Sequence, residues 1–137
     1  METYEKLSSR LDAIPVFVST VLNRLKALGL SREELFDTKL CLDEALINAV
    51  KHGNKFNPDL KIEVRIKVKD KTLSIEVKDQ GKGFNFKEIP NPTREEHLQR
   101  NSGRGIFLIK QHMDKVKHFG CGNKIRMIKF LKTGGKR

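Results

Sequence analysis

The sequence is poor in cysteine, tryptophan and long apolar runs, and each shortage excludes a class of protein. Its two cysteines, Cys41 and Cys121, have neither the spacing of metal ligands nor that of a redox pair. A disulfide scaffold and a zinc finger are therefore excluded, and a reducing, cytoplasmic compartment is expected. No stretch approaches the roughly 18 apolar residues of a membrane span, and the acidic residues 1–5 do not form a secretory signal.

The chain does contain enough apolar and charged residues for a folded domain with a strong positive charge. Of its 137 residues, 37% are hydrophobic and 33% are charged, which predicts one domain spanning residues 1–137 rather than a disordered chain. The net charge is +11, and residues 93–137 alone hold 12 Lys and Arg against 3 Asp and Glu. This excess indicates an anionic ligand or partner, unless the charges only solvate the surface.

Two helices are predicted in the first half of the chain. Apolar residues recur at helical spacing over residues 18–28, with Asp12 as a candidate cap for that helix. Ser31 and Glu34 have the spacing of a capping box, which predicts the start of a second helix. This second helix has a wide apolar face and ends at residues 53–54, where glycine and asparagine follow each other.

The second half of the chain changes to the period of β-strands. Strict alternation of apolar and polar residues predicts strands at 62–68 and 73–77, joined by a turn at 70–71. A second strand pair is predicted at 116–119 and 125–131, with its turn at residues 120–123. A helix is predicted to begin at Gly103, and residues 5–11 are a weaker strand candidate. Paired strands with interspersed helices predict an α+β two-layer sandwich in which the helices gather on one face of the sheet.

A polar stripe on the second helix is the first candidate site. Glu44, Asn48 and His52 follow one another at i, i+4 steps, so a regular helix stacks them along one line. A carboxylate beside an amide oxygen suits Mg²⁺, which prefers oxygen ligands. The carboxylate could instead accept a proton from an attacking hydroxyl, and an ordinary solvated helix face remains a third interpretation.

The second candidate site is a glycine loop directly after a predicted strand. Asp79 is followed by Gly81 and Gly83, and two glycines spaced in this way let the backbone approach a flat ligand closely. The carboxylate of Asp79 could accept a hydrogen bond from an exocyclic amine such as that of adenine. A plain loop is the alternative. The third glycine of a dinucleotide-binding fingerprint is missing, and the chain has no Walker A sequence.

The third candidate site lies at the start of the helix that follows. Gly103, Arg104, Gly105 and Ile106 begin this helix, whose N-terminal N–H groups could bind phosphate, with the arginine adding a positive charge. Glycine in an ordinary loop is the alternative. The polar stretch between the second and third sites, which carries Lys82 and three further cations, is long for an unstructured loop and predicts a mobile lid.

In order and spacing, the three sites resemble the motifs of the GHKL ATPase superfamily. Residues 43–53 resemble its N-box, residues 79–84 its first glycine box and residues 103–109 its second. The small size and the Glu-x-x-x-Asn-Ala pattern are most similar to the bacterial anti-sigma factor serine/threonine kinases. The resemblance covers roughly residues 1–131. It implies the Bergerat-type ATP-binding fold, with a mixed, mostly antiparallel sheet and helices on one face.

The resemblance also implies a role for each matching residue, with ATP and Mg²⁺ as cofactors. Asn48 would coordinate Mg²⁺, Glu44 would be the general base that accepts the proton of a substrate serine, and Asp79 would hydrogen-bond the adenine amine. The remaining cofactor-binding positions would be Gly81, Gly83, Gly103, Arg104, Gly105 and Ile106. Many superfamily members carry a late Gly-Thr that supports the pocket, whereas residues 120–124 contain no threonine.

The family further implies partners. The protein would sequester an RNA polymerase sigma factor, phosphorylate a serine of a small anti-sigma-antagonist protein and form a homodimer, without contacting nucleic acid or membrane directly. An ATP-binding anti-sigma module without kinase activity is the main alternative. A nucleic-acid-binding protein is suggested by the basic C-terminal third alone, since no recognition motif is present. A detached histidine-kinase catalytic domain is disfavoured, since no helical hairpin with a phosphoacceptor histidine precedes the domain.

Overall fold

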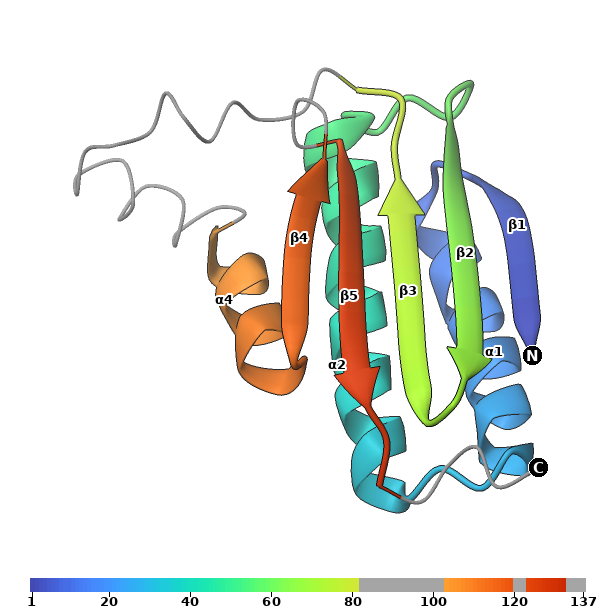
Figure 1. Ribbon diagram of the computed structural model, residues 1–137. Helices are drawn as coiled ribbons and strands as arrows, with labels where there is room; N and C mark the ends of the chain where they lie inside the picture. Colours follow the sequence, from blue (N-terminus) through green and yellow to red (C-terminus); the bar gives the residue numbers. More distant parts are fainter. Residues whose placement is uncertain (82–102, 120–122, 133–137) are drawn as a thin grey trace, which may run out of the picture.

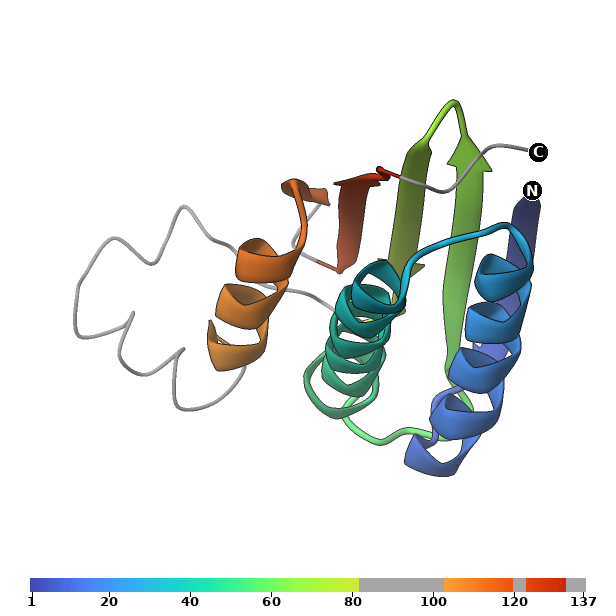
Figure 2. The ribbon, with the colours of Figure 1, turned by 90° about the horizontal axis from the view of Figure 1, so that it is seen from below.

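A five-stranded sheet and a layer of helices on one of its faces form the computed structural model of the protein (Figures 1 and 2). The structure describes residues 1–81, 103–119 and 123–132, without the side chains of residues 103, 104 and 106. The helical segments, in chain order, are η1 (Leu11–Ala13), α1 (Ile14–Ala27), α2 (Arg32–Asn48), η2 (Ala49–Gly53) and α4 (Gly103–His112). This arrangement confirms the predicted two-layer α+β sandwich.

The sheet is antiparallel at each of its strand pairings. Its strands are β1 (Glu2–Ser8), β2 (Lys61–Lys69), β3 (Thr72–Lys78), β4 (Lys115–Phe119) and β5 (Lys124–Phe130), in the spatial order β1-β2-β3-β5-β4. Both predicted strand pairs are confirmed. The two-residue turn between β2 and β3 has positive φ at both Asp70 and Lys71, which suits the right-handed twist of a hairpin.

The predicted first strand was misplaced, and so was the first helix cap. The sequence suggested a strand at residues 5–11, whereas β1 starts three residues earlier and ends at Ser8, because its register is set by pairing with β2 far away in the chain. Asp12 does not cap α1. It lies inside η1, and its carboxylate pairs with Arg10 at 2.8 Å, while Ala13 takes the cap position.

The start of α2 follows the prediction closely. The Ser31 hydroxyl accepts a hydrogen bond from the Glu34 N–H at 3.1 Å, and the Glu34 carboxylate accepts one from the Ser31 N–H at 2.8 Å. This reciprocal pair satisfies two N–H groups that an uncapped helix leaves without partners. The capping box therefore fixes where α2 begins.

The core lies between the sheet and the helices. Alternate residues of β2 and β3 face α1 and α2 and are buried, including Ile62, Ile66 and Ile75, while the intervening residues face away from the helices. Truncating one of these isoleucines to alanine is expected to lower the free energy of unfolding by about 2–5 kcal/mol. The core thus fixes the position of α2, on which the first candidate site lies.

Cys41 is part of this core. It is completely buried on α2, and its thiol points to the carbonyl oxygen of Ile109 on α4 at 4.0 Å. Burial, and next the negative charge of Asp37, raise the pKa of the thiol to about 12. Cys121 lies outside the described residues.

None of the helices in the described ranges is both long and apolar enough to cross a lipid bilayer.

Candidate functional site

The C-terminal half of α2 lies directly against the first turn of α4. A Cβ atom built on Gly105 would stand only 2.6 Å from Oε2 of Glu44 and 2.9 Å from Nδ2 of Asn48. A side chain at position 105 would have to displace the ends of the Glu44 and Asn48 side chains, so glycine lets α4 lie directly against them. The structure therefore brings the first and third predicted motifs together: a carboxylate and an amide beside a helix N-terminus.

The polar stripe does not continue as a regular helix. After Asn48 the chain forms the π-helical turn η2, in which the N–H of Asn54 bonds to the carbonyl of Ala49 at 2.8 Å. The predicted i, i+4 step from Asn48 to His52 is therefore wrong in its geometry, because a wider turn rotates the residues after Asn48. Such turns often occur at functional sites, and here the turn carries Gly53 towards the end of β3.

Asp79 is the buried acid at this end of the sheet. It is 8% exposed, and its Oδ1 accepts a hydrogen bond from the N–H of Gly81 at 2.8 Å. Burial raises the pKa of the carboxyl above its ordinary value, and the Gly81 hydrogen bond opposes the shift. A buried carboxylate whose desolvation is only partly offset is well suited to accept a hydrogen bond from a ligand donor.

Two glycines allow the segments around Asp79 to meet. A Cβ on Gly53 would stand 2.2 Å from the Asp79 carboxylate, and a Cβ on Gly81 would stand 1.8 Å from the carbonyl oxygen of Gly53. At Gly81 the backbone of Gly53 excludes a side chain, and at Gly53 a side chain would displace the buried carboxylate of Asp79. The end of α2 and the loop after β3 therefore form one unit, which joins the first and second predicted motifs.

Asn54 supports this unit and was not recognised from the sequence. Its side chain is buried, donates to the hydroxyl of Ser9 and the carbonyl of Lys61, both at 3.1 Å, and accepts from the N–H of Gln80 at 2.8 Å. It thereby links the end of α2 to β1, β2 and the loop after β3. The only local signal was its position after Gly53, where it was interpreted as a helix stop.

Asn123 provides a second support, at the turn where the family pattern has a threonine. Its carbonyl accepts a hydrogen bond from the N–H of Asp79 at 2.9 Å, and its side-chain amide donates to the carbonyl of Asp79 at 3.3 Å. These two bonds hold the backbone of Asp79 to the start of β5. The missing threonine therefore does not leave this strand end without a connection.

Several predicted site residues fall partly or wholly outside the described part of the chain. Gly83 and the lid expected to follow it lie outside the described residues. Gly103, Arg104 and Ile106 belong to the backbone of α4, which confirms a helix at that position, but their side chains are not described. Their proposed contacts with phosphate stay predictions.

The oxygen atoms at this site fit a magnesium ion that takes most of its ligands from bound phosphates and water, with few from the protein. Within residues 1–81, 103–119 and 123–132, no cluster of three or more His, Cys, Asp or Glu side chains is arranged to hold a metal ion. Mg²⁺ is commonly bound through one or two protein oxygens together with substrate phosphates and water. Asn48, beside Glu44 and the glycine at 105, offers one such oxygen at the helix N-terminus where phosphates bind favourably.

Comparison with known proteins gives the same family from sequence and from structure. The sequence profile described as the histidine kinase-like ATPase domain matches residues 7–129. The serine-protein kinase RsbW of Staphylococcus epidermidis is 30% identical over 142 residues, which cover 95% of this chain and 89% of that protein. The protein of the same name from Listeria innocua is 33% identical, covering 93% of this chain and 88% of that protein.

A solved structure supports the fold. The crystal structure of the RsbU and RsbW domains of a Mycobacterium tuberculosis protein superimposes with a TM-score of 0.70 over 98% of this chain and 33% of that longer chain. At 13% sequence identity, this similarity supports the architecture of the sheet and helices rather than any shared ligand.

Proposed function

Because this chain belongs to the family of histidine kinase-like ATPase domains, we propose that it is an ATP-dependent protein serine kinase that acts as an anti-sigma factor. One observation of the structure carries the proposal: Glu44 and Asn48 face Gly105 at the start of α4, while Asp79 is buried against Gly53 at the end of the same α2–η2 segment. The first group suits a triphosphate and the second a purine amine. The similarity to serine-protein kinases over more than nine-tenths of the chain supports this assignment.

The purine would bind at the Asp79 end of the site. The ionised carboxylate would accept a hydrogen bond from the exocyclic amine of adenine, and Gly81 and Gly83 would let the backbone lie close to the ring. The triphosphate would extend to α4, where Gly103, Arg104, Gly105 and Ile106 would offer N–H groups and one guanidinium. Asn48 would hold Mg²⁺, which supplies positive charge to the phosphate oxygens.

The chemical step follows from the position of Glu44. The hydroxyl of a substrate serine would attack the γ-phosphorus of ATP, forming the new P–O bond as the bond to the β-phosphate oxygen breaks and ADP leaves. The carboxylate of Glu44 would accept the proton of that hydroxyl. Positioning and charge neutralisation supply most of the rate in such transfers. The close approach of Glu44 on α2 to Gly105 on α4 supports this role, since it would hold the base beside the proposed phosphate site.

The partners in this proposal come from the family. The substrate would be a small anti-sigma-antagonist protein, and the sequestered partner an RNA polymerase sigma factor. The active form would be a homodimer in the cytoplasm. The whole chain, residues 1–137, would act as one kinase domain.

Capture of native partners followed by phosphoserine analysis tests the proposal. The protein is used to isolate its partners from its own cells, and the isolate is incubated with Mg²⁺ and ATP before mass spectrometry. We expect a sigma factor and a small protein that gains one phosphoserine, with no gain when a non-hydrolysable ATP analogue replaces ATP. Tight nucleotide binding with no phosphoserine in any partner would instead support the ATP-binding anti-sigma module without kinase activity.

A further inference from the structure

The face of the sheet that the helices leave open gathers most of the positive charge of the protein. Directly opposed residues of antiparallel strands point to the same side, so the registers place ten cations on this face against the three glutamates Glu2, Glu63 and Glu76. The cations are Lys6, Lys61, Arg65, Lys67, Lys69, Lys78, Lys115, Lys117, Lys124 and Arg126. The open face therefore carries a net charge of +7, out of +11 for the whole chain.

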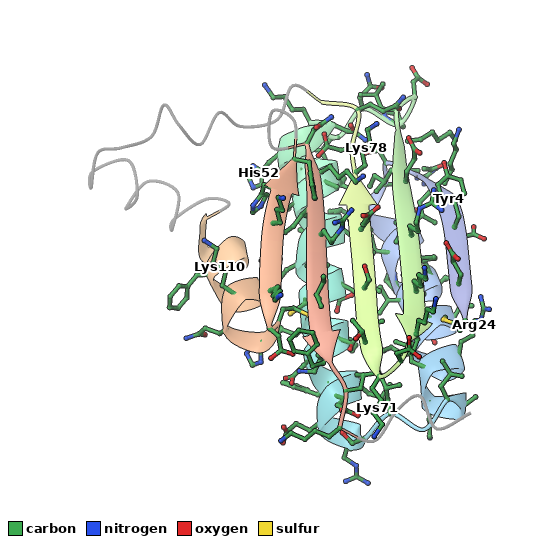
Figure 3. All side chains as sticks on the ribbon, viewed as in Figure 1. Tyr4, Arg24, His52, Lys71, Lys78 and Lys110 are labelled. Carbon is green, nitrogen blue, oxygen red and sulfur yellow. The ribbon has the colours of Figure 1, made fainter. Side chains whose placement is uncertain are left out.

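Figure 3 shows this face from the front, with the helices behind the sheet and Tyr4 and Lys78 labelled. The charge extends across all five strands, from Lys6 on the β1 edge to Lys117 on the β4 edge. An ordinary protein surface intersperses both signs of charge. A face with a single predominant sign over its whole width indicates an anionic partner.

Few of these cations are neutralised within the protein. Glu76 accepts Arg126 at 2.6 Å and Lys124 at 3.4 Å, and Arg65 lies 3.7 Å from Glu2. Among the described residues, the other seven cations of this face have no carboxylate oxygen within 4.0 Å: Lys6, Lys61, Lys67, Lys69, Lys78, Lys115 and Lys117. Their charges are therefore available to an external anion.

Aromatic rings lie among the cations towards both edges of the face. Tyr4 on β1 is 44% exposed and lies under the guanidinium of Arg65, at 4.9 Å from the ring centre. Phe130 on β5 is 52% exposed, with the ammonium of Lys115 at 5.8 Å. Exposed rings and guanidinium planes on a sheet are the surfaces on which unpaired bases stack.

We propose that the open face of the sheet binds single-stranded nucleic acid, with lysines contacting the phosphates and the exposed rings of Tyr4 and Phe130 contacting bases. A protein partner fits less well, because lysine is depleted at protein–protein interfaces and eight of the ten cations are lysines. A second copy of the chain would bring two faces of the same charge together. A duplex fits less well too, since its major groove admits a helix or a two-stranded ribbon rather than a five-stranded face.

This proposal goes beyond the kinase function and is independent of it. The purine and phosphate sites lie on the helix side of the sheet, around α2, whereas the proposed surface is the opposite side. The sequence alone shows a basic C-terminal third without a recognition motif, which does not favour nucleic acid as a partner. The strand registers add that cations from the first, middle and last parts of the chain meet on one face.

Fluorescence anisotropy with a labelled oligo(dT) and a labelled oligo(U) probe tests the proposal on the full chain. The variant Lys69→Glu/Lys117→Glu reverses two charges on the open face, and Lys26→Glu/Arg32→Glu makes the same net change on exposed positions of the helix layer. We expect the first variant to bind about tenfold or more weakly and its salt slope to fall by about 1.4, at roughly 0.7 per lost phosphate contact. The control should stay within about twofold, and both variants should keep the thermal unfolding midpoint and ADP affinity of the wild type.

Three outcomes would overturn the proposal. One is no binding of either probe at low salt, and another is an equal loss in both variants, which would reflect bulk charge alone. The third is displacement of the probe by polyglutamate, a duplex or anionic lipid vesicles as effectively as by unlabelled single strands, since the face would then accept a different anion. Loss of kinase activity leaves these readouts unchanged, so the two proposals fail separately.

Discussion

The two ends of helix α2 differ in how their polar side chains are satisfied. Near its start, Glu34 accepts hydrogen bonds from the N–H groups of Ser31 and Lys132, and Asp37 pairs with His112 and Lys129, each at 3.0 Å. These contacts tie α2 to α4 and to the end of β5. Glu34 and Asp37 are thus both engaged within the protein.

Near the other end, the side chains of Glu44 and Asn48 make no hydrogen bond or ion pair with any residue that the structure describes, although they lie against Gly105. Both ends belong to one helix and carry the same types of side chain. Glu34 and Asp37 therefore hold α2 to other elements of the fold, whereas the Glu44 and Asn48 side chains are left for a ligand. Exchanging a carboxylate for an amide at each end tests this division.

The largest effect is expected for Glu44→Gln. Removing a general base typically lowers the rate of a proton-coupled step by about 10²–10⁴-fold, and the amide keeps the size of the side chain. Single-turnover phosphoryl transfer to the captured substrate protein should fall by this factor, while ADP affinity measured by calorimetry changes less than about threefold. Asp37→Asn, the same exchange on the same helix, is the matched control and should retain transfer well below its unfolding temperature. Unchanged transfer in the Glu44 variant would refute the assignment of the base.

Asp79→Asn is expected to have the next largest effect. It should weaken ADP binding and raise the stability of the ligand-free protein. The variant loses a charged hydrogen-bond acceptor worth about 1.5–3 kcal/mol, so ADP affinity should fall by about 10–100-fold. Because burial raises the pKa of this carboxyl, its ionised form destabilises the folded state. The ligand-free variant should therefore have a higher unfolding midpoint than the wild type in calorimetry. A variant that is less stable and binds ADP normally would contradict a ligand-binding role for Asp79.

Asp37→Asn should lower stability without changing the nucleotide site. It breaks the ion pairs of Asp37 with His112 and Lys129, in which the lysine and the aspartate are mostly buried. A loss of about 1–3 kcal/mol in the free energy of unfolding is expected, measured by urea denaturation. ADP affinity should stay within about twofold of wild type. A large loss of ADP affinity would show that the two ends of α2 are coupled. It would contradict a purely structural role for Asp37.

The smallest effect is a pH dependence of nucleotide binding. The raised pKa of Asp79 means that its carboxyl becomes protonated at a higher pH than an ordinary aspartate near 3.9. Binding needs the ionised acceptor, so ADP affinity should fall as the pH is lowered from neutral into the acid range in which Asp79 becomes protonated. The contribution of Asp79 to stability runs the other way, because protonation removes the buried charge. Calorimetric titrations at several pH values measure the effect, and Asp79→Asn should abolish it.

Much of the fold follows from local patterns in the sequence. The capping box at Ser31, the alternation of β2 and β3 and the helix starting at Gly103 depend on residues a few positions apart, and all three are confirmed. The first strand was displaced because its limits depend on pairing with β2, some sixty residues away. Periodicity carries no information about such a distant partner.

The candidate site could be predicted as three motifs but not as one arrangement. The spacing of Glu44 and Asn48 is local, whereas their approach to the glycine at position 105 is set by packing of α2 against α4. The π-helical turn was missed, because the sequence of η2 does not differ from that of a regular helix. The hydrogen bonds that join Asn54 to Ser9 and Gln80, and Asn123 to Asp79, connect positions far apart in the chain, so no local sequence pattern predicts them.

The buried thiol of Cys41 can report the separation of α2 from α4. Only a thiolate reacts readily with alkylating agents, and a pKa of about 12 together with complete burial keeps this group unreactive while α2 packs on α4. In a variant whose other cysteine is replaced by serine, the alkylation rate of Cys41 therefore reports how often α2 and α4 separate. A nucleotide that contacts both helices would lower the alkylation rate of Cys41.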